Sequence, residues 1–376
     1  MILPAYFDHA ATTPLLPEVL NAMMPYLTES YGNASSRHHA YGWLVEAAIE
    51  DSKTQILSCF QATNAQIVFT SGATEAINTV LFGFANKNPK GQIISLKTEH
   101  KATLACLDNL EEKGYQVSYL PVDQDGNFDF IDLEKTINAH PGLTLFSFLW
   151  VNNETGLVHP IEKIAALKAN LSFEMHVDAS QAVGKMPIQF KKLGIDYLTY
   201  SAHKIYGPKG IGAILSKNRI SKMMFGGGQQ SDQRGGTLNT PAIVGLAAAT
   251  QIATDKIAAY IMHTGSLQTL FENALQEHLD VFQIHSKTSQ RVSNITSLAI
   301  SGTDSELILR QLAPKFALAN GSACNAASTL PSHVLKAMGF SDEHAYSTIR
   351  ISFGWQNTEE QVDEFVKMIH QILSQK

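Results

Sequence analysis

The sequence predicts an α/β fold with a large domain built on a mainly parallel sheet and a smaller α+β domain. Between residues 67 and 216, short apolar runs alternate with stretches in which apolar residues recur at helical spacing, as in a doubly wound sheet. The runs are almost wholly apolar, as expected of parallel strands that are buried on both faces. After Gly226-Gly227-Gly228 this alternation stops, so a second kind of architecture is expected there.

The individual elements follow from these patterns. The strands expected in the large domain are 67–70, 92–96, 116–120, 143–151, 173–177, 197–201 and 211–215. Helices are expected between them, as over 101–113, where Leu104, Leu107 and Leu110 have helical spacing. The smaller domain is expected to contain a long helical stretch over 240–279, strands over 294–300 and 349–353, and a closing helix over 359–374. The expected domains are 16–249 (large) and 1–15 with 250–376 (small).

Composition excludes several classes of protein. Of the 376 residues, 44% are hydrophobic and 16% charged, which is typical of a compact globular chain. The net charge is −6 and no basic run occurs, which argues against direct binding of nucleic acid. No apolar run approaches the ~20 residues of a membrane span, and the amino terminus lacks the regions of a secretory signal.

The cysteines point to a reducing compartment. Cys59, Cys106 and Cys324 are too few and too widely spaced for a disulfide framework or a zinc cluster. We therefore expect a cytoplasmic protein with no metal site, in which any important cysteine acts as a thiol.

Polar residues follow the ends of five expected strands. They are the turn Ser71-Gly72-Ala73-Thr74, then His100, Asn153 with its neighbours, Asp178 with Gln181, and Ser201 with His203 and Lys204. In an open parallel sheet, ligands bind outside the carboxyl ends of the strands. A lone lysine is usually a solvated loop residue, but this one coincides with four other polar clusters. The five clusters together predict one binding site.

Lys204 and Asp178 suit the chemistry of pyridoxal phosphate (PLP). A lysine amine forms a Schiff base with the PLP aldehyde, and an aspartate keeps the pyridine nitrogen protonated, so that the ring can accept electrons. The turn at 71–74 precedes a helical stretch whose free N–H groups and dipole would hold a phosphate. Taken singly, each feature has a simpler interpretation, such as an N-capped helix for the turn or a helix cap for Asp178.

Over nearly its whole length the chain resembles the cysteine desulfurases of the NifS/IscS type, within the class V aminotransferase branch of the fold type I PLP enzymes. The matching segments are 8–14, 32–33, 69–75, 98–101, 151–156, 176–181, 201–210, 234–237 and 321–324. So many matches in one order are specific to a family. The resemblance implies a fold type I PLP-dependent transferase that works as a homodimer with shared active sites.

The resemblance also implies how the cofactor is held. Lys204 would form the Schiff base and move a proton at the substrate α-carbon, while Asp178 would pair with the pyridinium nitrogen. Gln181 would hydrogen-bond the phenolic oxygen, and His100 would stack on the ring or deprotonate the substrate thiol. The residues implied to hold the phosphate are Ala73, Thr74, Ser201, His203 and, from the neighbouring subunit, Thr237.

The implied substrate site lies beside the cofactor. Asn33, Asn153 and Arg350 would hold the substrate carboxylate, and Asn153 would also contact the cofactor. A guanidinium suits this role because it binds a carboxylate with two parallel hydrogen bonds. Ala34 stands where relatives usually have proline, and Gly235 stands where serine is common. These differences loosen turns without removing a ligand.

Cys324 decides which reaction is expected. A single cysteine is most often a small buried hydrophobe, but the residues around Cys324 are small and polar, and they match the family's persulfide-forming loop. The resemblance implies that the Cys324 thiolate takes sulfur from L-cysteine, which leaves as L-alanine. A sulfur-acceptor protein of unknown identity would then carry the sulfur to iron–sulfur cluster, thio-cofactor or tRNA biosynthesis.

Other functions stay open. A selenocysteine lyase or another class V PLP enzyme would share the cofactor site, although an aminotransferase needs no thiol at position 324. A weakly catalytic sulfur-relay subunit would work mainly by binding a partner. The intact set of Lys204, Asp178, His100, Arg350 and Cys324 argues against that last alternative.

Overall fold

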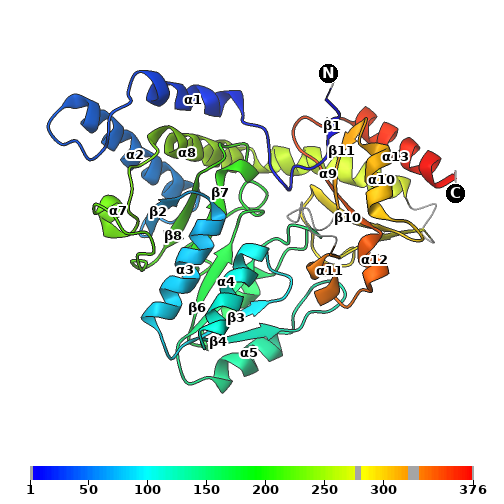
Figure 1. Ribbon diagram of the computed structural model, residues 1–376, viewed down its shortest axis with the longest axis horizontal. Coiled ribbons are helices and arrows are strands. Elements are labelled where there is room, and N and C mark those ends of the chain that lie inside the picture. The colour runs from blue at the N-terminus through cyan, green and yellow to red at the C-terminus, as the bar shows by residue number, and fades with distance from the viewer. Residues whose placement is uncertain (1–2, 276–280, 321–329, 375–376) are drawn as a thin grey trace.

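The computed structural model describes residues 3–275, 281–320 and 330–374. Figure 1 shows a larger part that contains a sheet flanked by helices and a smaller part that holds both ends of the described chain. Among the described residues, no helix combines the length and the apolar character needed to cross a membrane.

A seven-stranded sheet forms the centre of the larger part, in the order β2-β8-β7-β6-β5-β3-β4. Its strands are β2 (Gln66–Thr70), β3 (Gln92–Leu96), β4 (Gln116–Leu120), β5 (Thr144–Leu149), β6 (Phe173–Asp178), β7 (Tyr197–Ser201) and β8 (Gly212–Ser216). The pairings from β4 through β7 are parallel, and β8 is antiparallel to both of its neighbours. All seven expected strands are confirmed, so the carboxyl ends of β3, β5, β6 and β7 meet at one edge.

Helices cover both faces of this sheet. They are α1 (Pro17–Thr28), α2 (Ala40–Cys59), α3 (Ala73–Lys87), α4 (Lys101–Glu112), α5 (Phe130–Ala139), α6 (Ile161–Leu167), α7 (Gln229–Asp232) and α8 (Thr240–Asp255). Successive strand residues alternate between two cores: Phe146 and Phe148 belong to one, and Leu145 belongs to the other with residues of α3 and α4. This alternation follows from the two-residue repeat of a strand.

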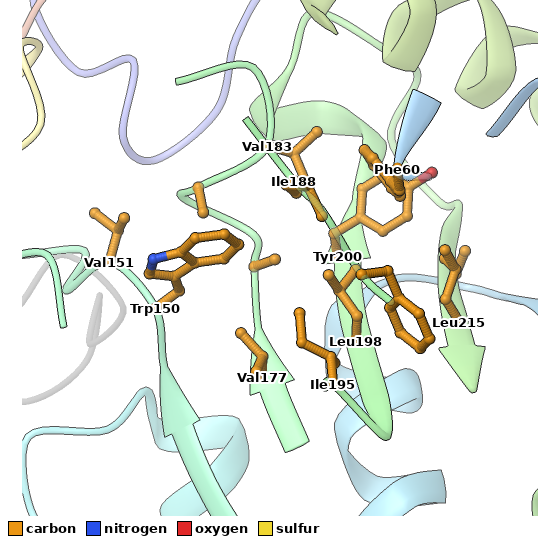
Figure 2. Packing of buried hydrophobic residues seen from close by; sticks show 14 of the residues in the cluster. Phe60, Trp150, Val151, Val177, Val183, Ile188, Ile195, Leu198, Tyr200 and Leu215 are labelled. Carbon is orange, nitrogen blue, oxygen red and sulfur yellow. The ribbon is translucent and has the colours of Figure 1, made fainter. Parts of the chain in front are cut away.

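The first of these cores is rich in aromatic side chains. Figure 2 shows part of it, where Phe60 and Tyr200 lie close together and Trp150 follows the end of β5. The rings of Phe60 and Tyr200 meet edge to face, with centroids 5.4 Å apart, an arrangement that aromatic pairs prefer. This packing fixes β7 and therefore the segment that follows it, which carries Ser201, His203 and Lys204.

The smaller part has its own sheet and core. The sheet has the order β12-β13-β10-β9, and its strands are β9 (Phe282–Ile284), β10 (Ile295–Ile300), β12 (Ala319–Asn320) and β13 (Thr348–Ser352). A separate pair joins β1 (Ala5–Tyr6) to β11 (Phe316–Ala317). The helices are α9 (Ile257–Ala274), α10 (Ser305–Leu312), α11 (His333–Ala337), α12 (Asp342–Tyr346) and α13 (Glu359–Ser374). Both expected strands and the closing helix are confirmed.

The expected helical stretch over 240–279 is divided into α8 and α9. The backbone leaves the helical region at Lys256, with φ −101° and ψ 11°, although neither glycine nor proline marks the break. Residues 276–279 lie outside the described residues. The boundary expected between residues 249 and 250 falls inside α8, a continuous helix that packs on α1 and α2. The division into two domains stays a prediction.

Candidate active site

A cavity of about 530 Å³ lies at the carboxyl ends of the parallel strands. Residues from the amino-terminal segment, from the loops after β2, β3, β5, β6 and β7, and from β13 line it. The expected site residues that the structure brings together there are Ala73, Thr74, His100, Asn153, Asp178, Gln181, Ser201, His203, Lys204 and Arg350. These residues therefore share one cavity at this edge of the sheet, and their roles stay predictions.

The turn before α3 has the form of an anion site. Gly72 is the N-cap of α3, with a φ of +155° that favours glycine, so the first N–H groups of a fifteen-residue helix face this end of the cavity. The Ser201 hydroxyl lies 3.4 Å from the backbone nitrogen of Ala73. Gly212 lies close behind the turn, where a Cβ would come within 2.8 Å of Gly72. Strand β8 can therefore support the turn only with glycine at this position.

A carboxylate lies in this same wall and is neutralised there. Glu75 accepts the backbone N–H of Ser71 at 2.7 Å and forms two hydrogen bonds with Arg234, at 2.9 and 3.2 Å. Burial alone would raise the pKa of Glu75, but the hydrogen bonds from Arg234 and Ser71 outweigh it and lower that pKa. The pair thus prevents an uncompensated negative charge beside the turn.

Lys204 follows β7 at the end of the short helix η1 (Ala202–Lys204). Its Nζ donates to the carbonyl oxygens of Ala10 and Ala11, both at 2.7 Å. These carbonyls belong to the amino-terminal segment, which pairs with the smaller part through β1. These two backbone acceptors thus hold the amine in the cavity.

Asp178 is the last residue of β6 and is almost fully buried. Its Oδ1 accepts both the backbone N–H and the hydroxyl of Ser180, at 2.9 and 2.6 Å. Among the described residues, no protein group is hydrogen-bonded to Oδ2. A buried carboxylate with one oxygen fixed and one available suits a cationic N–H donor in the cavity.

His100 is the N-cap of α4, and its Nδ1 accepts the backbone N–H of Ala102 at 3.1 Å. The proton of the neutral ring is therefore carried by Nε2. Burial is the main reason that the pKa of His100 lies below the ordinary 6.5; Asp178 opposes this shift and Lys204 adds to it. The ring is neutral at pH 7, as a base or a stacking partner requires.

Arg350 projects from β13 into the cavity and is only 2% exposed. One terminal nitrogen pairs with Asp8 at 2.8 Å and the other donates to the carbonyl of Asn153 at 2.9 Å. Its Nε is buried and has no partner among the described residues. Buried donors are nearly always satisfied, so the orphaned Nε indicates that an acceptor such as a carboxylate binds beside it.

Three expected site residues are not part of this cavity wall. Asn33 and Thr237 are exposed and do not line the cavity of the single chain, and Cys324 lies outside the described residues. The roles assigned to them stay predictions. For Thr237 the position agrees with the expectation that it serves a neighbouring subunit.

Sequence reasoning overlooked several groups that the structure places at the site. The carbonyls of Ala10 and Ala11 hold Lys204, Asp8 holds Arg350, and buried Lys185 donates to Gln181. The segment 8–14 was noticed only through its resemblance to a family. A backbone carbonyl leaves no signal in the sequence, but the four-residue spacing of Gln181 and Lys185 does.

The residues present fit PLP. The helix N-terminus beside Ser201 suits a phosphate, the available Oδ2 of Asp178 suits a pyridinium N–H, and Lys204 provides the amine that holds an aldehyde. Together the sheet order and this donor set define a PLP-type α/β enzyme.

The comparisons with known proteins agree with that class. The model of the family described as Aminotransferase class-V matches residues 5–365, and the chain belongs to this family. It is 38% identical, over 99% of its own length and 92% of the relative's, to cysteine desulfurase IscS of Dechloromonas aromatica (strain RCB).

Solved structures show the same relationship. A NifS-like protein superimposes with a TM-score of 0.91 at 33% identity, covering all of both chains. A second structure, described as SspA in complex with cysteine, superimposes with a TM-score of 0.80 at 34% identity, covering 93% of this chain and 99% of that one. The family and the fold expected from the sequence are confirmed.

Proposed function

We propose that this chain is a PLP-dependent cysteine desulfurase that converts L-cysteine to L-alanine and stores the sulfur as a persulfide on Cys324. The observation that carries the proposal is the single cavity that holds Lys204, Asp178, the turn before α3 and the orphaned Nε of Arg350. Near-full-length similarity to cysteine desulfurases and the thiol at position 324 select this reaction within the family.

The cavity wall provides a partner for each part of the cofactor. Ala73, Thr74, Ser201 and His203 surround the phosphate position, and Thr237 of a second subunit completes it. Asp178 would pair with the ring nitrogen, and the Gln181 amide would hydrogen-bond the phenolic oxygen. When bound, PLP withdraws electrons from the substrate α-carbon and thereby makes the removal of its proton possible.

The substrate is oriented by Arg350. Its Nε and the adjacent terminal nitrogen together offer two donors to the carboxylate of L-cysteine, while Asp8 and the carbonyl of Asn153 hold the guanidinium in place. The α-carbon is then positioned close to Lys204, whose amine moves the proton there. Asn33 contributes to the same carboxylate site.

Sulfur transfer requires two thiolates in turn. Neutral His100 takes the proton of the substrate thiol on Nδ1, which gives up the hydrogen bond from the Ala102 N–H as it does so, and the Cys324 thiolate then attacks that sulfur. An S–S bond forms while the substrate C–S bond breaks, and the electron pair of the broken bond remains with the three-carbon fragment, which takes up a proton and leaves as alanine. The persulfide passes to an acceptor protein for iron–sulfur cluster, thio-cofactor or tRNA biosynthesis in the cytoplasm.

The decisive experiment measures alanine and protein-bound persulfide formed from L-cysteine by the purified PLP-loaded protein. The parent is expected to form both, whereas Cys324→Ser binds the cofactor but forms no persulfide. Lys204→Ala loses the visible absorbance of covalently held PLP. Cys59→Ser is the matched control, because Cys59 is a half-buried cysteine whose sulfur pairs with Gln251 far from the cavity wall. Desulfuration that persists in Cys324→Ser contradicts the proposal.

A further inference from the structure

A fully buried lysine lies behind the active site and has no role in the reaction described above. Lys185 is 6% exposed, and none of the ion pairs among the described residues includes it. Its Nζ donates to Oε1 of Gln181 at 2.6 Å. Burying a lysine without a carboxylate costs free energy. The function of Lys185 is therefore expected to depend on the residue that it binds, Gln181.

That partner connects Lys185 to the lysine of the cavity. Gln181 Nε2 donates to the carbonyl oxygen of Ala10 at 2.8 Å, and Lys204 Nζ donates to the same oxygen at 2.7 Å. The path therefore runs from Lys185 through the Gln181 amide and one shared backbone acceptor to Lys204. Both Gln181 and Ala10 line the large cavity.

The direction of the Gln181 amide follows from this path. An ammonium group can only donate hydrogen bonds, so Lys185 requires the amide oxygen, and the NH₂ group is left for the other side. One N–H of that group binds Ala10, and the second remains for a ligand in the cavity. A carbonyl oxygen facing an anionic acceptor would repel it, so Lys185 on the amide oxygen and Ala10 on the NH₂ group together keep Gln181 in the orientation that can serve the cofactor.

We propose that Lys185 is a positioning residue that fixes the Gln181 amide with its NH₂ group toward the cavity, and so sets the proton affinity of bound PLP. The inference rests on the proposed function, because it concerns the phenolic oxygen of that cofactor.

The surroundings of Lys185 agree with this role. A small cavity of about 20 Å³, enough for one water molecule, is lined by both Lys185 and Lys204. Burial, followed by the positive charges of Lys204 and Arg350, lowers the pKa of Lys185 to about 7. Burial lowers the pKa of His9, which interacts with Lys185, to about 4. It also raises the pKa values of Tyr206 and Tyr260, which line the same small cavity. Lys185 still donates to Gln181 as a neutral amine, because an amine retains N–H groups.

The test is the pH midpoint of the visible absorbance of bound PLP, measured together with the amount of cofactor bound. Lys185→Met keeps the volume of the side chain but removes the donor to Oε1, so the amide is held by Ala10 alone and its N–H to the phenolic oxygen is weakened. We expect the variant to bind PLP and to show a midpoint raised by about one unit, the size expected for one hydrogen bond to a charged group.

Two further variants separate this role from others. Gln181→Met removes the amide and should raise the midpoint by the same amount, which also keeps the inference testable if Lys185→Met fails to fold. In the Gln181→Met background, Lys185→Met should then have no further effect. Lys256→Met is the matched control, because Lys256 lines the same small cavity but is exposed and lies outside the path.

Three outcomes would contradict the positioning role of Lys185 or the proposed function on which it rests. An unshifted midpoint in PLP-loaded Lys185→Met or Gln181→Met refutes the positioning role. A shift from Lys185→Met that persists in the Gln181→Met background shows that the charge acts directly rather than through the amide, and also refutes it. A parent protein that binds no PLP refutes the proposed function itself, and this inference with it.

Discussion

Burial shifts the pKa values of titratable side chains near the cavity in the direction that favours their uncharged forms. The pKa of His203 is lowered to about 4 by burial and by the nearby Lys204 and Lys209, and burial raises the pKa of Glu99 well above its ordinary value. In both groups burial thus favours the uncharged form. Lys204, Asp178 and Arg350 remain as the groups that meet cofactor and substrate, and Arg350 is held in place by its ion pair with Asp8.

The pH dependence of the reaction should report His100. Since burial lowers the pKa of His100 below 6.5, its ring gains a proton only as the pH falls below that value, and the base needed for the substrate thiol is then lost. The acid limb of kcat/KM for alanine formation should accordingly lie below pH 6.5. His100→Gln should lower kcat by about 10²-fold and abolish this limb while retaining PLP. An acid limb that is unchanged in His100→Gln would assign it to another group.

At the scale of elements, the ion pair between Glu75 and Arg234 connects the first turn of α3 to the segment that follows α7. Arg234→Ala should leave the Glu75 carboxylate uncompensated beside the phosphate position and weaken PLP binding roughly 10-fold. Lys222→Ala, which breaks an exposed pair with Asp232, should leave the affinity unchanged. Equilibrium titration of the apoprotein with PLP measures both, and adding Glu75→Gln to Arg234→Ala should restore part of the loss.

A second connection between elements joins α11 to the loop after β5. Ser332, the N-cap of α11, donates its hydroxyl to the buried Glu154 carboxyl group. Burial raises the pKa of Glu154 to about 7, against the opposing effects of Ser332, Arg350 and Lys101. The folded chain thus keeps a proton that the unfolded chain releases above about pH 4.5, so this group makes stability fall as the pH rises from about 4.5 to about 7.

Glu154→Gln should remove that contribution. Between about pH 5 and about pH 8 the variant should gain stability relative to the parent, by at most about 3 kcal/mol, as measured by urea unfolding of the apoprotein at both values. Glu162→Gln, an exposed position on α6, should follow the parent. Parallel pH dependences of Glu154→Gln and the parent would show that Glu154 is already ionised in the folded chain.

At the scale of the whole molecule, the surface expected to form the homodimer is that of α1 and α2. The helices α1 and α2 pack on α8 at one end of the molecule (Figure 1) and expose large apolar side chains, among them Leu27 at 53% and Leu44 at 57%. Equilibrium sedimentation should give twice the 41.1 kDa of one chain. Leu27→Asp with Leu44→Asp should yield monomers that bind PLP more weakly, because Thr237 of the second subunit is lost. Leu307→Asp, an equally exposed leucine on α10, should leave the dimer intact.

The sequence predicted the sheet well because its strands are apolar runs separated by polar turns, and it located the site because polar residues follow those runs. It did not predict the division at Lys256, since residues on both sides favour helix and no glycine or proline intervenes. Nor could it predict that Asp8 pairs with Arg350, because that contact joins opposite ends of the chain and depends on the bridge between Asp8 and Ser352 of β13. The carbonyls of Ala10 and Ala11 that bind Lys204 were not predicted either. Every residue has a backbone carbonyl, so no sequence pattern distinguishes these two.

The cavity is built from residues near both ends of the sequence, from Ala10 to Arg350. This determines when, during synthesis of the chain, the cavity can form. A chain that leaves the ribosome amino terminus first can assemble β2 to β8 before β13 has been synthesised. The cavity, however, is lined by both Ala10 and Arg350. A complete wall therefore exists only after almost the whole polypeptide has emerged, and cofactor loading belongs to the finished chain rather than to the nascent one.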